Sequence, residues 1–360
     1  MAENKDFDSI MREITGGMSG DSKADMAYLQ DQMEKYKDHE MRKEIIRACG
    51  RLMYELIPDD KKEELAKLIN NESSGTDAAL EEVHFNIYKK DFDKALRIME
   101  ALVTKVEDMK AFEDDQVSEY HVFDEFFEEV LYQYRTKPDK DIRRAQIPYT
   151  EIYMLYGSLL VELKRIPEAQ EALRKGLRWN PVSFRITSEY IETYKMTGDL
   201  EQFFDLTKEA FKIAFRSADV ARCYRNLGFY FVEKKLWSEA IACYLLSLQF
   251  DHESKQAQSE LYYINSSTDG KIPEPSIDQA KAYGDKYGFP IGADDDVLGL
   301  AFSYGKHFLD QNAVDAAKYF LTIVYDLTGD NEIAKMIDSL PQSQSSEKKS
   351  TRQMTPFGIP

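Results

Sequence analysis

The sequence has few cysteines and no long apolar run. Three cysteines among 360 residues, at positions 49, 223 and 243, are too few and too scattered for a disulfide framework, and they fit a reducing compartment. The first residues, MAENKDFDSI, show no basic and apolar signal-peptide pattern. No segment approaches the ~18 uninterrupted apolar residues of a membrane-spanning helix. We therefore expect a cytoplasmic protein without a membrane segment.

Positive charge is also in deficit. Forty-seven Lys and Arg residues face 65 Asp and Glu residues, which gives a net charge of −18 at pH 7. A surface this acidic repels phosphate backbones, so a nucleic-acid partner is not expected.

Motifs for catalysis, metals and cofactors are missing as well. The histidines are far apart and show no HExxH spacing, and the chain has no Walker loop, GxGxxG or GxSxG pattern. GADDDV at 292–297 is too short for an EF-hand loop and is expected to cap the next helix. Cys223 and Cys243 fall in apolar helical patterns and are expected in the core. The sequence therefore predicts no catalytic residue, no metal site and no cofactor.

Helical spacing covers most of the chain, and no strand-like alternation of any length is visible. Residues 1–21 end in a Gly/Ser-rich stretch, and residues 341–360 form a polar tail, so both are expected to be disordered. Residues 22–72 are predicted to be N-terminal helices, with a loop at NNESSGTD (70–77). Residues 76–136 are predicted to contain a helical hairpin and then one long aromatic helix, EYHVFDEFFEEVLYQYR.

One constellation recurs three times between residues 150 and 340. A glycine inside a helical segment is followed twelve residues later by an alanine, and large residues surround both. A helix-interior glycine costs about 1 kcal/mol relative to alanine, so its recurrence indicates helices that approach closely where they cross. The three pairs are Gly157 and Ala169, Gly228 and Ala240, and Gly305 and Ala317.

This constellation resembles the tetratricopeptide repeat, a helix-turn-helix unit of ~34 residues. The glycines lie 71 and 77 residues apart, so each interval is expected to hold one degenerate repeat. In the first interval Ile191 and Phe203 replace the small pair, and in the second an insertion near 266–275 separates the helices. The resemblance implies an all-α solenoid of helical hairpins, with about five units over 150–340 after an N-terminal helical region and one earlier degenerate repeat. A generic helical bundle is the alternative.

In that family the first helix of each repeat lines a concave groove that usually holds an extended peptide or a partner helix. An arginine fork can hold a carboxylate, and an asparagine amide suits a peptide backbone. The resemblance therefore implies a peptide-binding site, although these arginines could instead be neutralised by glutamates on the same helices. Alignment to the family assigns to this site Arg185, Arg222, Arg225, Asn226 and Lys306.

The arginine set resembles the clamp of chaperone-binding family members but is incomplete. The preceding repeat has Glu151, Met154 and Ser158 where a full clamp would have Lys and Asn, so chaperone binding does not carry over. The sequence favours a non-catalytic adaptor or scaffold that binds a protein or an extended peptide. The alternatives are a peptide-responsive signalling regulator with the N-terminal helices as effector region, and an enzyme without a recognisable motif. Self-association is also possible because solenoid ends expose apolar faces unless capped.

Overall fold

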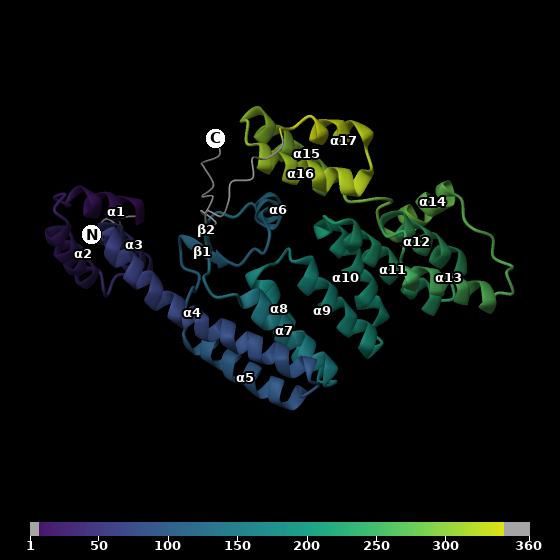
Figure 1. Cartoon of the computed structure of the whole chain (residues 1–360), viewed down its shortest axis with the longest axis horizontal. Helices are drawn as coiled ribbons and strands as arrows, with labels where there is room; N and C mark the ends of the chain where they lie inside the picture. The colour runs from purple at the N-terminus through teal and green to yellow at the C-terminus, as the bar shows by residue number, and fades with distance from the viewer. Residues whose placement is uncertain (1–6, 342–360) are drawn as a thin grey trace. The chain divides into compact units, whose positions relative to one another are not determined.

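The computed structural model describes residues 7–341, and over this range its regular structure is 17 α-helices, one 3₁₀ helix and two short strands (Figure 1). The predicted all-α solenoid of helical hairpins is confirmed. The chain divides into two compact units, and the boundary falls after Phe203, inside α10 (Leu200–Ala210). None of the described helices combines the length and the apolar character needed to cross a bilayer.

The N-terminal helices form a small core of their own. They are α1 (Phe7–Gly16), α2 (Ser22–Lys35) and α3 (Arg42–Leu56). Residues 1–21 were expected to be disordered, but α1 is ordered because its apolar residues recur at helical spacing and pack onto the next two helices. Residues 1–6 lie outside the described range. The fully buried residues of this core are Ile10, Ile14, Leu29, Ile45 and Cys49.

The first hairpin of the array consists of α4 (Asp59–Tyr88) and α5 (Phe92–Asp108). The loop predicted at 70–77 is wrong, because α4 continues through it as one helix. A single glycine and several polar residues lower helix propensity only modestly, and burial of the C-terminal half of α4 on α5 compensates. Val83 and Ala95, the degenerate counterparts of the glycine and alanine, are both fully buried.

An insertion that the sequence did not indicate separates this hairpin from the next. Strand β1 (Ser118–His121) runs parallel to β2 (Asp141–Arg144), with Ser118 opposite Asp141, and α6 (Phe126–Thr136) forms the crossover. The expectation of no strands is therefore wrong. The long aromatic helix is also shorter than predicted, because its first residues belong to β1.

Two carboxylates and a helix cap explain this correction. Asp115 Oδ1 accepts the N–H groups of Val117 and Ser118 at 3.0 and 2.7 Å, which holds the chain extended before β1. Glu125 and Glu128 form a reciprocal capping box at the start of α6. The helix therefore begins at Phe126 and leaves the preceding residues free to pair with β2.

The three glycine-containing hairpins share one packing contact. A Cβ added at Gly157, Gly228 or Gly305 would lie 2.6–2.9 Å from a large side chain of the second helix. That side chain comes four residues after the paired alanine, so glycine makes room for it at the crossing. The hairpins are α7 (Tyr149–Glu162) with α8 (Ile166–Trp179), α11 (Ser217–Glu233) with α12 (Trp237–Phe250), and α15 (Asp295–Asp310) with α16 (Val314–Thr328). The side chains that face the glycines are Leu173, Tyr244 and Leu321, and the fully buried alanines are Ala169, Ala240 and Ala317.

The degenerate repeat between α12 and α15 is not an ordinary hairpin. Both of its helices pack against α12, and residues 268–276 connect them without helix. The insertion lengthens the turn, so the two helices need not pack closely on each other. The remaining elements are α9 (Phe184–Thr197), η1 (Phe211–Ile213), α13 (Lys255–Ser267), α14 (Ile277–Tyr287) and α17 (Asn331–Asp338).

Candidate functional site

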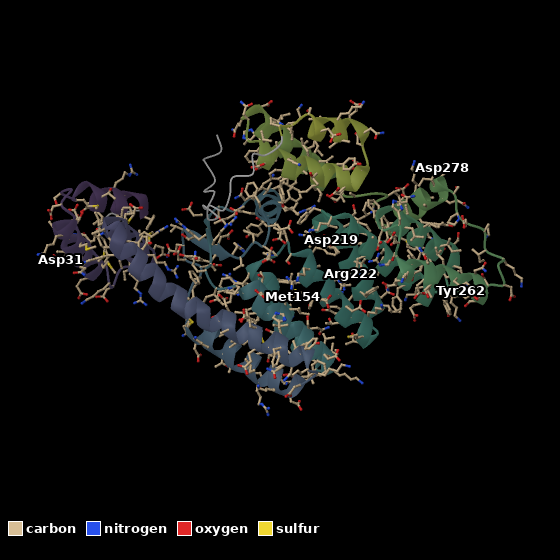
Figure 2. The ribbon with its side chains drawn as sticks, in the orientation of Figure 1. Asp31, Met154, Asp219, Arg222, Tyr262 and Asp278 are labelled. Carbon is tan, nitrogen blue, oxygen red and sulfur yellow. The ribbon has the colours of Figure 1, made fainter. Side chains whose placement is uncertain are left out.

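The first helices of the hairpins in the first unit lie next to one another. His84 Nε2 of α4 lies 3.9 Å from Glu151 Oε1 of α7, and α7 in turn contacts α9. Met154 of α7 is half-buried (Figure 2), and Tyr88 at the end of α4 is 86% exposed. The first unit therefore presents a surface of mixed charged and apolar side chains on its first helices.

Arg185 lies in the first turn of α9. The N-cap Ser183 and the buried Ser188, whose hydroxyl donates to the Arg185 carbonyl at 3.0 Å, fix the backbone there. The Arg185 side chain is exposed. Across the described residues it forms no ion pair, so its fork of donors is open to solvent.

Arg225 of α11 is used by the fold of the second unit. Its side chain is 14% exposed, and Nη1 donates to Asp251 Oδ2 at 3.2 Å. The same nitrogen lies 3.4 Å from Ser247 Oγ and 3.5 Å from the α13 cap residue Ser254. Burial lowers the pKa of Arg225, opposed by the Asp251 charge. This guanidinium joins α11 to the end of α12 and the start of α13, which the sequence position alone did not indicate.

Arg222 and Asn226 are half-buried and lie one turn apart on α11. Asp219, in the first turn of the same helix, lies near Arg222 (Figure 2). Burial raises the pKa of Asp219 to about 6, and the charges of Arg216 and Arg222 oppose that rise. The Asn226 side chain makes no hydrogen bond within the part of the chain that the structure describes.

Lys306 lies on α15 and is exposed. Its Nζ is 5.6 Å from the centre of the Phe302 ring, one turn earlier, which is cation–π geometry. Lys306 therefore rests on its own helix and leaves its charge at the surface.

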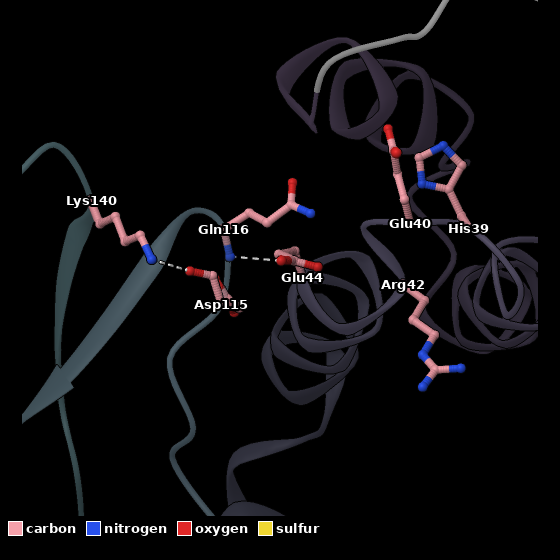
Figure 3. A pocket seen from close by; sticks show the side chains of 7 residues that line it. All are labelled: His39, Glu40, Arg42, Glu44, Asp115, Gln116 and Lys140. Carbon is pink, nitrogen blue, oxygen red and sulfur yellow. Dashed lines mark hydrogen bonds between the residues drawn. The ribbon is translucent and has the colours of Figure 1, made fainter.

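A polar cavity of about 520 Å³ in the first unit was missed by the sequence analysis (Figure 3). The Gln116 N–H donates to Glu44 Oε1 at 2.7 Å, and Lys140 Nζ donates to the Asp115 carbonyl at 2.6 Å. The partners are far apart in sequence, so no local pattern could reveal them. The lining residues are His39, Glu40, Arg42, Glu44, Asp115, Gln116 and Lys140.

Beside this cavity, a salt bridge links α3 to the segment before β1. Arg47 Nη1 donates to Asp115 Oδ2 and to the Glu113 carbonyl, both at 2.7 Å, and the Asp115 side chain is only 2% exposed. We call the contacts of Glu44 and Arg47 with residues 113–116 the polar joint. It attaches the N-terminal helices to the array.

Side chains suited to catalysis or metal binding are not gathered in residues 7–341. No group of three or more His, Cys, Asp or Glu side chains in this range is placed to hold a metal ion. Asp294 of GADDDV accepts the Val297 N–H at 3.1 Å, so the predicted helix cap is confirmed. Cys223 and Cys243 are buried as predicted, and burial raises the pKa of both thiols.

No protein-family model matches the sequence, and no curated protein is similar to it. Three solved structures are similar at low identity. YrrB, described as a TPR protein with an unusual peptide-binding site, is 13% identical over 52% of this chain and 91% of its own, with a TM-score of 0.28. A tetratricopeptide repeat protein from Parabacteroides merdae is 10% identical over 92% of this chain and 97% of its own, with a TM-score of 0.37.

The third is the Cut9–Hcn1 hetero-tetramer of the APC/C. It is 14% identical over 77% of this chain, with a TM-score of 0.33, and the match spans about half (52%) of that chain. Similarity at this level carries no inference about function. The assignment of the repeats rests on the glycine crossings and stacked hairpins of the chain itself.

Proposed function

We propose that this chain, whose fold is that of a tetratricopeptide repeat protein, is a non-catalytic scaffold that binds a protein or an extended peptide on the first helices of its repeats. The observation that carries the proposal is the exposed Arg185 guanidinium, which has no ion pair among the described residues. The fold does not use this charge, whereas it does use Arg225.

The chemistry of the first helices suits a peptide with a carboxylate. In the first unit, Arg185 offers a bidentate fork, and the neighbouring helix α7 supplies the apolar Met154. In the second unit, Asn226 offers a donor and an acceptor to a peptide backbone, with Arg222 one turn away. Each unit thus presents its own set of contacts, and Lys306 adds a further exposed cation.

A peptide-display selection on the full chain tests this proposal. Peptides enriched on the wild type are measured against Arg185→Ala and, separately, Arg222→Ala/Asn226→Ala. We expect at least one variant to weaken binding by ~2 kcal/mol, a plausible loss for charged hydrogen bonds. The matched control is Arg174→Ala, which removes an exposed arginine of the second helix α8 that pairs only within its own helix, with Glu171. Equal binding by all four proteins would refute the proposal.

A second function, that of a peptide-responsive regulator with the N-terminal helices as effector, is favoured by one observation. Helices α1–α3 have their own core and meet the array through the polar joint. Such a joint can be biased by a ligand more easily than an apolar core. Hydrogen exchange of α1–α3 should then change when a selected peptide binds, whereas a plain scaffold would show protection only at the peptide site.

A further inference from the structure

An apolar groove runs along one face of the α4–α5 hairpin, away from the first-helix surface described above. Its volume is about 530 Å³, and α4 and α5 lie side by side along it (Figure 1). The floor consists of Ala79 from α4 and Ile98, Ala101 and Leu102 from α5. Ala101 is exposed, while Ala79 and Ile98 are only partly buried.

The position of this hairpin explains the open face. α5 uses its other side, with Met99, Val103 and Val106, to pack in the core that includes α7. Each hairpin of a solenoid buries its faces against its neighbours, and the first hairpin has a neighbouring hairpin on one side only. Terminal repeats usually cover the remaining face with polar residues, whereas this one keeps an apolar floor.

Three cations line the groove. Lys94, Arg97 and Lys105 all belong to α5, and with Ile98 and Ala101 they follow the spacing of one helix face. Lys94 pairs with Glu82 at 3.1 Å. Arg97 and Lys105 form no ion pair with any residue whose side chain the structure describes. In a chain of net charge −18, a groove edged by cations is a local exception.

We propose that this groove binds an amphipathic helix of a partner protein, with an apolar ridge in the groove and acidic residues beside the ridge. Apolar side chains at i, i+3, i+4 and i+7 would contact the floor, as in other helix-in-groove complexes. Carboxylates flanking that ridge would pair with Arg97 and Lys105. Polyanionic surfaces such as nucleic acid or anionic membranes fit less well, because the rest of the chain repels them.

A helix library provides the probe. Eighteen-residue peptides carry leucines at the four ridge positions and random residues beside them, and they are selected on the full chain. The test variant is Arg97→Glu/Lys105→Glu. The control is Lys271→Glu/Lys335→Glu, which makes the same charge change at two exposed lysines that pair only locally. A third variant, Ala101→Trp, fills the groove without changing charge, and circular dichroism verifies that each variant folds.

We expect the enriched peptides to carry Asp and Glu beside the ridge. Their affinity should fall at least tenfold with Arg97→Glu/Lys105→Glu and with Ala101→Trp, and it should be unchanged in the control. Enrichment of neutral or basic flanks, equal binding by the test and control variants, or no enriched helix would each overturn the proposal. Binding of the wild type to phosphatidylserine vesicles through the same cations, without helix binding, would overturn it in favour of a membrane surface. Arg185→Ala should leave this binding intact, so this result is independent of the proposed function.

Discussion

At the scale of single residues, the same residue type has opposite effects in two places. Gly228 faces the buried Tyr244 ring, and an added Cβ would lie 2.7 Å from it. Gly299, on α15, has nothing within 4 Å of such a Cβ. Only the first glycine is required by packing, while the second carries the helix-propensity penalty without compensation.

Substitution of each glycine by alanine tests this difference. Gly228→Ala should lower the free energy of unfolding by ~1–3 kcal/mol, because the ring must move in a close-packed core. Gly299→Ala should raise it by ~0.5–1 kcal/mol, because alanine favours the helix and restricts the unfolded chain. Urea unfolding followed by circular dichroism measures both. If the two variants shift stability in the same direction, the crossing contact is not what the glycine provides.

The carboxyl of Asp219 should make stability depend on pH. Burial raises its pKa to about 6 from an ordinary value of 3.8, so between these values the folded state binds the proton more tightly than the unfolded state. The free energy of unfolding should therefore fall as pH rises from about 4 to 6, and Asp219→Asn should remove roughly 1–3 kcal/mol of this dependence. Parallel stability profiles for wild type and variant, measured from pH 4 to 8, would contradict this assignment.

At the scale of elements, the β1–α6–β2 insertion depends on one buried carboxylate. Glu128 Oε2 accepts the N–H groups of Asp124 and Glu125 at 2.7 and 3.0 Å and the Asn180 amide at 2.9 Å. It thereby starts α6 and attaches the insertion to the residue that ends α8. A hydrophobic cluster alone would not hold this turn, because its backbone donors would remain unsatisfied.

Glu128→Ala should destabilise the insertion by ~2–4 kcal/mol, because it leaves three donors without their charged acceptor. Hydrogen exchange should accelerate in residues 118–147 and remain close to wild type in α11 and α12. The control is Glu171→Ala, whose carboxylate is 53% exposed and pairs with Arg174 on its own helix, so an effect below ~0.5 kcal/mol is expected. Unchanged exchange in 118–147 would show that the turn does not depend on Glu128.

At the scale of the whole molecule, the polar joint attaches a separate small core to the array. Asp115 is nearly inaccessible and is satisfied by Arg47 and by two backbone N–H groups. Breaking a buried pair from one side typically costs 3–5 kcal/mol, because the remaining charge has lost its partner.

Arg47→Ala should therefore loosen the joint while leaving both cores folded. We expect faster proteolysis and hydrogen exchange in residues 109–118, with little change in the Ile10–Ile45 core. Lys35→Ala is the matched control, because its contact with Glu13 at 3.8 Å is exposed and should contribute little. Loss of the α1–α3 core together with the joint would show that these helices do not form a unit of their own.

The sequence by itself determined the helical class, the repeat and the residues at its crossings, because these follow from spacing within one hairpin. It also predicted the cap at Asp294 and the burial of Cys223 and Cys243, which are local or periodic features. The lost loop at 70–77 and the ordered α1 show where weak local propensity misled the prediction. Packing on a neighbouring element overrode it in both cases.

Tertiary structure alone decided what depends on partners far apart in the chain. Residues more than 60 positions apart form the polar joint, and a residue 26 positions away binds Arg225. Strands β1 and β2 pair across α6, and the groove of the α4–α5 hairpin opens on a face that no following repeat covers. A sequence pattern records which face of a helix is apolar. Whether another element covers that face, or which charge meets which, is decided only when the helices stack.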